Sequence, residues 1–178
     1  MKRAPASLQA RALGWLAQRE QSRSELRRKL MRMAQRQQRA AAAEAAGQAD
    51  ADAEAESPDP AALAAPIDAL LDQLQAQGLL SEERFIEGRV RVRAAGQGTR
   101  RIQSELAQHG LKLPPQSLQA LQQSEAERAM QLWQRKFGQP AADLRERARQ
   151  MRFLAARGFS GATIRAVLAA AAEQADNG

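Results

Sequence analysis

Two segments share one pattern and decide the predicted fold: TRRIQSELAQHG (Thr99 to Gly110) and LRERARQMRFLAARG (Leu144 to Gly158). A third basic segment, SRSELRRKL (Ser22 to Leu30), resembles them 76 residues ahead of the middle one. A fixed offset of tens of residues indicates a repeated supersecondary unit. In the segments that begin at Thr99 and Leu144, an arginine, an apolar leucine and a closing glycine recur at an offset of 48 residues: Arg101 and Arg149, Leu106 and Leu154, Gly110 and Gly158.

The composition favours an all-helical protein. Of the 178 residues, 44% are hydrophobic, and there is no Tyr, with four Phe and two Trp. Strong helix formers therefore far outnumber strand formers. The chain has no Cys and a single His, which excludes a disulfide scaffold, thiolate chemistry and the usual zinc ligand sets. We expect no metal, no cofactor and no catalytic residue, so the chain is not expected to be an enzyme.

The net charge of +7 is unevenly distributed along the chain. Residues 1–40 hold eleven Lys/Arg against two Glu, residues 41–83 hold ten Asp/Glu and no Lys/Arg, and residues 84–112 hold seven Lys/Arg against two Glu. Blocks of arginine suggest a polyanionic partner, either nucleic acid or a protein wrapped around it, although arginine can also be a soluble helix-favouring filler. No apolar run approaches the roughly 18 residues that span a bilayer. We therefore expect a cytoplasmic monomer without membrane contact.

The apolar spacing predicts three units of three helices each, over residues 1–80, 81–123 and 124–178. The first interval between the basic segments is longer than the second by 28 residues, and an alanine-rich acidic insertion at 34–65 accounts for the difference. Residues 31–46 favour a helix and can extend the second helix, whereas Ser57 to Pro60 should break it. We interpret the insertion as a solvated linker; the alternative is that its carboxylates fold back on the arginine surface.

Local signals mark the expected helix ends. Gly78 is placed to take the left-handed conformation, and Ser160 is placed to cap the last helix. Capping boxes are predicted at two starts, Ser22 with Glu25 and Ser124 with Glu127. Four positions of the last unit's middle helix are predicted to be buried: Leu144, Ala148, Met151 and Leu154.

The aromatic residues Trp15, Phe85 and Trp133 are interpreted as core. Phe159, between a glycine and a capping serine, is predicted to staple two helices; the alternative is an exposed ring that meets a partner.

Four stretches of the chain are informative together: SRSELRRKL, LDQLQAQGLLSEERF (Leu71 to Phe85), RVRVR with TRRIQSEL, and RARQMRFLAARGFS. In this order and spacing they resemble the RecX family, bacterial regulators of the RecA recombinase. The resemblance covers nearly all of the chain outside Ala34 to Ala65 and implies an elongated, curved array of three tandem three-helix repeats. It also implies docking in the groove of the RecA filament on single-stranded DNA, with suppression of ATP hydrolysis, strand exchange and LexA cleavage. The long insertion departs from the family pattern.

Our site hypothesis places ten arginines along one side of this array, where their planar forks would engage carboxylates or phosphates and bridge neighbouring RecA protomers. The alternative is that they form ordinary ion pairs on a solvated face, for example with Glu25 or Glu146. The ten are Arg23, Arg27, Arg28, Arg91, Arg93, Arg100, Arg101, Arg149, Arg152 and Arg157.

A second class of function is a stand-alone DNA-binding protein, since helix pairs joined by short turns are typical of helix-turn-helix units. Such a protein should bind DNA without RecA and lose affinity steeply with salt. The segment Gly96-Gln97-Gly98 is too short, and lies between predicted helices, so it is not a phosphate-binding loop.

Overall fold

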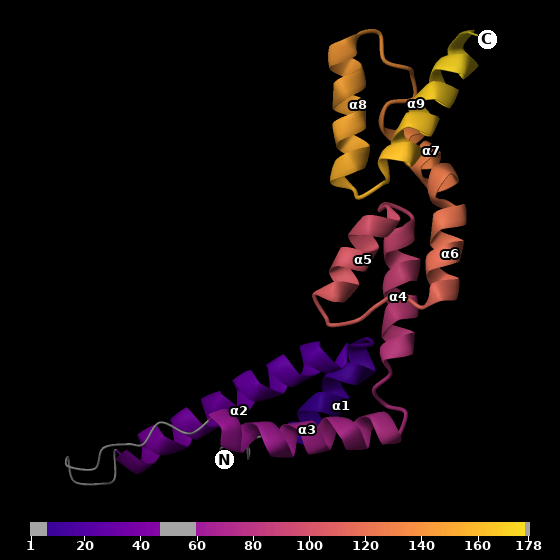
Figure 1. The fold of residues 1–178 in the computed structure, drawn as a ribbon. Helices are drawn as coiled ribbons and strands as arrows, with labels where there is room; N and C mark the ends of the chain where they lie inside the picture. Colours follow the sequence, from indigo (N-terminus) through magenta and orange to yellow (C-terminus); the bar gives the residue numbers. More distant parts are fainter. Residues whose placement is uncertain (1–6, 47–59, 177–178) are drawn as a thin grey trace. The chain divides into compact units, whose positions relative to one another are not determined.

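The computed structural model describes residues 7–46 and 60–176, which are helical and contain no strand, so the all-helical prediction is confirmed for them. The chain divides into two compact units, Met1–Phe85 and Ile86–Gly178, and the division falls inside the fourth helix. The boundaries of the three repeats stay predictions. The helices of the described residues are α1 (Leu8–Gln18), α2 (Arg23–Ala46), α3 (Pro60–Ala76), α4 (Glu82–Ala94), α5 (Thr99–Ala107), α6 (Pro115–Gln123), α7 (Glu125–Lys136), α8 (Leu144–Ala156) and α9 (Gly161–Asp176) (Figure 1).

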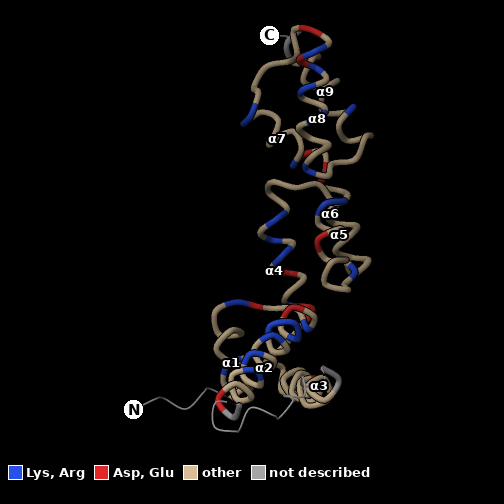
Figure 2. The backbone as a smooth tube through the Cα atoms, turned by 90° about the vertical axis from the view of Figure 1, so that its left-hand side faces the viewer, with Lys and Arg blue, Asp and Glu red and all other residues tan. Residues whose placement is uncertain are grey.

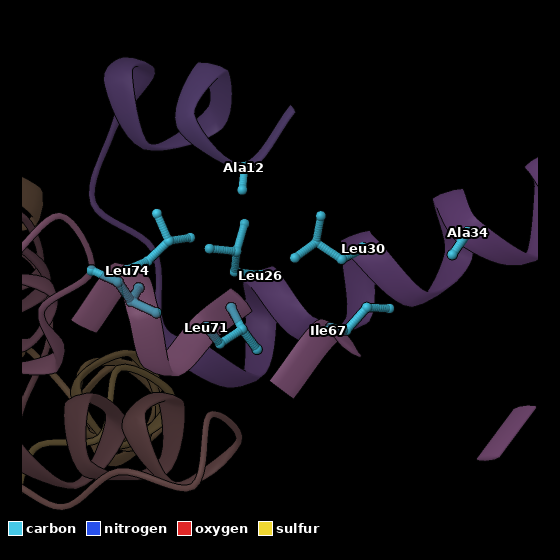
Figure 3. Packing of buried hydrophobic residues seen from close by; sticks show 8 residues of the cluster. Ala12, Leu26, Leu30, Ala34, Ile67, Leu71 and Leu74 are labelled. Carbon is cyan, nitrogen blue, oxygen red and sulfur yellow. The ribbon is translucent and has the colours of Figure 1, made fainter. Parts of the chain in front are cut away.

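The core of the first unit is an apolar seam in which α2 packs mainly on α3 (Figure 3). Leu26 and Leu30 of α2 and Ile67 and Leu71 of α3 are completely buried, together with Ala12 of α1. The spacing of four residues places each pair on one side of its helix. Because burying a leucine contributes about 1.5–3 kcal/mol, this seam fixes α2 against α3.

The second helix is longer than its apolar pattern requires. It runs to Ala46, as the helix propensity of residues 31–46 predicted, and α3 begins at Pro60, a residue whose missing amide hydrogen is not needed in a first turn. Ala34 is 4% exposed and Leu63 packs against the core, so both ends of the segment 34–65 contribute to the unit. The two ends of the segment that was interpreted as a solvated linker are therefore packed on the core through Ala34 and Leu63. The predicted break before Pro60 lies outside the described residues.

The second unit has its own core between α7, α8 and α9. Trp133 is 3% exposed, and Phe159 is also 3% exposed beside Ile164, so the prediction of a staple at this junction holds. Phe85, which belongs to the first unit, is buried as predicted, whereas Trp15 is only partly buried against the first core. The buried cluster of the second unit comprises Ala129, Trp133, Leu154, Phe159, Ile164, Val167, Leu168 and Ala171.

Glycines end the helices as predicted. Gly78, Gly110 and Gly158 have φ angles of 69°, 77° and 82°, a region that favours glycine. After each glycine, the next amide donates to a carbonyl five residues earlier: Leu79 to Leu74 at 2.9 Å, Leu111 to Leu106 at 3.0 Å and Phe159 to Leu154 at 3.3 Å.

The predicted buried face of α8 is partly wrong. Leu144 is 84% exposed and Met151 is 41% exposed, whereas Gln150 and Leu154 are buried. Gln150 is buried because the buried indole of Trp133 needs a hydrogen-bond acceptor. The indole Nε1–H donates to Gln150 Oε1 at 2.8 Å, and the side-chain amide of Gln150 donates to the Gln139 carbonyl at 3.2 Å. Leaving that indole unpaired would cost about 1–3 kcal/mol.

One of the two predicted capping boxes is wrong. Ser22 Oγ accepts from the Glu25 amide at 3.1 Å, and Ser160 Oγ accepts from the Thr163 amide at 3.1 Å, so these caps are confirmed. Ser124, however, has φ −87° and ψ 0° and makes no cap bond from its side chain. Because α6 reaches it in a helical conformation, its hydroxyl donates back to the Ala120 carbonyl at 2.9 Å instead.

Candidate functional site

Two of the ten predicted arginines hold α2 to α3. Arg27 makes a bidentate contact with Asp68, with Nε to Oδ1 at 2.7 Å and Nη2 to Oδ2 at 3.0 Å. Arg23 Nη1 lies 2.7 Å from Asp72 Oδ1. Hydrogen bonding from Arg27 lowers the pKa of Asp68, which keeps the carboxylate charged. Asp68 and Asp72 follow the insertion at 34–65, so these pairs do not test whether the insertion's own carboxylates fold back on the arginines.

Two further predicted site residues have partners within the second unit. Arg93 Nη2 donates to Glu105 Oε1 at 3.2 Å, and Arg89 donates to the same atom at 3.0 Å, so one carboxylate links α4 to α5. The guanidinium of Arg157 lies 3.8 Å from the ring centre of Phe153. Because this stacking and the packing around it leave Arg157 half-buried, its side chain serves the fold.

The remaining six predicted arginines are exposed and form no ion pair with a residue that the structure describes. The lysines and arginines stand out along α2 and α4 in Figure 2. Arg28 of α2 and Arg152 of α8 hold the same repeat position, two residues before a buried leucine. The six are Arg28, Arg91, Arg100, Arg101, Arg149 and Arg152.

Two of these six arginines, Arg149 and Arg152, line a hollow of about 420 Å³ on α8. Sequence reasoning missed its third arginine, Arg145, although the spacing of 145, 149 and 152 places all three on one side of a helix. Arg149 also lies 6.0 Å from the ring centre of Phe137. The hollow is lined by Asp143, Arg145, Glu146, Arg149 and Arg152.

The arginines of α5 are positioned by a backbone contact between α5 and α8. The Gly98 amide donates to the Arg157 carbonyl at 2.9 Å. A Cβ atom added to Gly98 would lie 2.3 Å from backbone atoms of Gly158, and one added to Gly158 would lie 2.5 Å from the Cβ of Arg101. Only glycine at both positions permits this approach, which places Arg101 at the junction of the two helices.

A buried carboxylate, Glu125, completes this junction and was not recognised in the sequence. Glu125 Oε1 accepts from the Thr99 amide at 2.9 Å, and Oε2 accepts from Thr163 Oγ1 at 2.8 Å and from the Ser160 amide at 3.4 Å. Burial raises the pKa of Glu125, but these hydrogen bonds outweigh it and the pKa is lowered. The carboxylate therefore stays charged at the first turns of α5 and α9, where the helix dipole favours it.

Arg128 closes the same junction one turn further along α7. Its guanidinium donates to the carbonyls of Ala94, Gln97 and Leu121 at 2.9, 2.7 and 2.8 Å. No sequence signal pointed to Glu125 or Arg128. Glu125 lies inside the capping box predicted at Ser124, and Arg128 follows that box directly. Together they link the first turn of α5, where Arg100 follows Thr99, to α7 and the start of α9.

The described residues contain no group of three or more His, Cys, Asp or Glu side chains placed to hold a metal ion. None of the helices in the described part of the chain is both long and apolar enough to cross a membrane. The geometry at hand is that of exposed guanidinium groups on rigid helices, which suits the binding of anionic partners.

Comparison with known proteins finds relatives that align along the whole chain. The protein is 41% identical over 180 residues to "Regulatory protein RecX" of Ralstonia pickettii (strain 12J), an alignment that covers 100% of this chain and 96% of the relative. The chain belongs to the RecX family. It is also 44% identical over 173 residues to the RecX protein of Leptothrix cholodnii, covering 96% and 93% of the two chains, and 43% identical over 180 residues to that of Herminiimonas arsenicoxydans, covering 99% and 100%.

A family model described as "RecX, third three-helix domain" matches residues 123–168. This range contains α7, α8 and the first part of α9, and therefore includes the hollow lined by Arg145, Arg149 and Arg152. The RecX relatives carry the name of regulatory proteins, so this chain is a member of a regulatory family.

Proposed function

We propose that this RecX-family protein binds the RecA filament on single-stranded DNA and lowers its strand-exchange, ATPase and LexA-cleavage activities. Membership of the family along the whole chain supports the partner. The observation that carries the proposal is the set of six arginines that project from α2, α4, α5 and α8 without an ion-pair partner among the described residues.

The docking surface in this proposal is smaller than the one the sequence suggested. Arg23, Arg27 and Arg93 are already bonded to carboxylates of their own unit, so binding through them would first require breaking those contacts. The six exposed arginines need no such exchange. Each planar fork can engage a carboxylate of RecA or a phosphate of its DNA through paired hydrogen bonds.

Inhibition follows if the protein bridges neighbouring RecA protomers. Hydrolysis and filament growth require protomers to move relative to one another. A ligand shifts such an equilibrium only through different affinities for the two arrangements. Within the second unit, helices that hold their arginines at fixed positions would favour one arrangement and so keep the filament in it.

The test is charge reversal in α5 with the variant Arg100→Glu/Arg101→Glu. Both residues lie in the first turn of α5, where acidic side chains are favoured by the helix dipole, so the fold should tolerate them. We expect inhibition of the DNA-stimulated ATPase of RecA to be lost. Inhibition at the wild-type level would remove α5 from the docking surface.

A matched control is Arg147→Glu/Arg165→Glu, which changes the net charge equally at two exposed positions outside the proposed surface. This control should inhibit like the wild type. Equal loss of inhibition in both variants would mean that net charge alone, and not the α5 site, supports binding.

The alternative function is a stand-alone DNA-binding protein, favoured by the net charge of +7. The deciding measurement is the ratio of affinity for the RecA filament to affinity for bare single-stranded DNA at one salt concentration. A ratio near one would favour the alternative.

A further inference from the structure

A second hollow, of about 430 Å³, lies between α1 and α2 in the first unit, and none of the predicted site arginines lines it. It combines four basic side chains with a floor of two apolar ones and has no carboxylate in its lining. Its lining residues are Arg11, Trp15, Lys29, Arg32, Met33 and Arg36.

The charge of this hollow is available for binding. Arg11, Arg32 and Arg36 are exposed and form no ion pair with a described residue; Arg32 Nε only donates to the backbone carbonyl of Arg28 at 3.3 Å. Arg32 and Arg36 are separated by four residues, about 6 Å along the helix axis, on one side of α2. The hollow on α8, by contrast, includes Asp143 and Glu146 in its lining. A polyanion would therefore meet less repulsion on α2.

The floor of the hollow is held in place by the core beneath it. Trp15 is partly buried and packs against the first core. The ammonium of Lys29 lies 5.6 Å from the Trp15 ring centre and is itself fixed by Gln21 at 2.8 Å and by Glu25 at 3.1 Å. The indole is thus an aromatic surface packed on the core, with the Lys29 ammonium over its ring and Met33 in the same lining.

We propose that this hollow binds single-stranded nucleic acid, with phosphates on Arg11, Arg32 and Arg36 and a base against Trp15. Proteins that bind single strands combine a positively charged groove with aromatic side chains in this way. An acidic peptide would satisfy the cations but has no planar group for the indole, so the aromatic floor favours nucleic acid. The site requires no RecA, and its failure would leave the proposed filament binding untouched.

The direct test uses an oligothymidylate of about 20 nucleotides without RecA. Two arginine contacts to a single strand contribute about 1.4 to the slope of log affinity against log salt. We therefore expect Arg32→Ala/Arg36→Ala to bind at least about tenfold more weakly at low salt, with a slope shallower by roughly that amount. The control Arg147→Ala/Arg165→Ala removes the same charge from the second unit and should bind like the wild type. Equal losses in both variants would overturn the site.

The aromatic part of the proposal has its own readout. The chain has two tryptophans, and Trp133 is buried, so quenching of fluorescence by the oligonucleotide should come from Trp15 and disappear in Trp15→Phe. An abasic oligonucleotide of equal length keeps the phosphates and should bind more weakly without quenching. Equal binding of the abasic strand, or of polyglutamate of the same charge, would overturn the assignment to single-stranded nucleic acid.

Discussion

The α2–α3 pair and the α5–α8 junction both hold arginine-bearing helices, but by different means. In the first, a buried apolar seam holds the helices, and Arg27 and Arg23 pair with Asp68 and Asp72 across it. The second uses a close contact of two glycines and the buried carboxylate of Glu125. Among the described residues, the arginines of α5 and α8 have no ion-pair partner, whereas Arg23 and Arg27 of α2 are paired. The number of arginines in a segment is therefore a poor measure of its binding surface; the charges of the neighbouring helix decide.

The largest expected effect comes from filling the glycine contact with Gly158→Ala. The added Cβ would lie 2.5 Å from the Cβ of Arg101, and the φ angle of 82° disfavours any side chain, so the free energy of unfolding should fall by on the order of 3 kcal/mol. Urea unfolding measures this. The control Gly88→Ala, inside α4 with open space around it, should be neutral or slightly stabilising. A similar stability for both variants would show that the backbone contact does not hold the junction.

The next largest effect is expected at Arg128, whose guanidinium group bonds to three carbonyls at the same junction. Arg128→Lys keeps the charge but cannot serve three carbonyls in fixed directions, so we expect a loss of about 1–3 kcal/mol in the free energy of unfolding. Arg135→Lys is the matched control, because Arg135 is exposed and donates to the single carbonyl of Ala95 at 3.1 Å. Equal, small losses in both variants would contradict this role.

Glu125→Gln tests the buried carboxylate and carries a pH signature. The pKa of Glu125 is lowered from its ordinary 4.5, so its contribution to stability is complete above that value and is lost as the pH falls through the lower, folded-state pKa. At pH 7 the variant should unfold about 1–3 kcal/mol more easily, and the gap to the wild type should narrow in acid. Thermal unfolding between pH 7 and pH 3 would show it. Glu127→Gln, exposed on the same helix, should leave the profile unchanged.

The variant Asp68→Asn/Asp72→Asn should have the smallest effect on stability. It also tests directly whether the charges of α3 decide which arginines of α2 are available for binding. The variant frees Arg27 and Arg23, and the stability should change little because both ion pairs are largely solvated. Binding to oligothymidylate should become tighter, with a salt slope steeper by about 0.7 for each arginine that gains a phosphate. Glu83→Gln/Glu87→Gln removes equal charge from α4. Unchanged binding in the aspartate variant would mean that these arginines face no ligand even when freed.

The sequence predicted the features that depend on local chemistry. Glycines at helix ends, the caps at Ser22 and Ser160 and the buried leucines of α2 and α5 all follow from rules that act within one or two turns. These rules need no knowledge of which helix lies opposite. They were therefore sufficient to predict the helices and much of the core.

The features that failed depend on distant partners. Gln150 is buried because Trp133, on another helix, needs an acceptor, and Glu125 is buried because three donors from α5 and α9 converge on it. In the same way, Arg27 looked like a binding residue because Asp68, 41 residues away, could not be placed opposite it. A periodicity argument ranks polar residues as exposed, and only the folded arrangement reveals which of them are paired.

The meeting of Gly98 and Gly158 also constrains how these two positions can drift in evolution. Since a side chain at position 98 would strike the main chain of Gly158 and not its side chain, no replacement at one site can compensate for a change at the other. In an alignment of relatives, the two columns should each be filled by glycine without covariation. Selection should remove insertions that shift either glycine along the chain as strictly as it removes substitutions of these glycines.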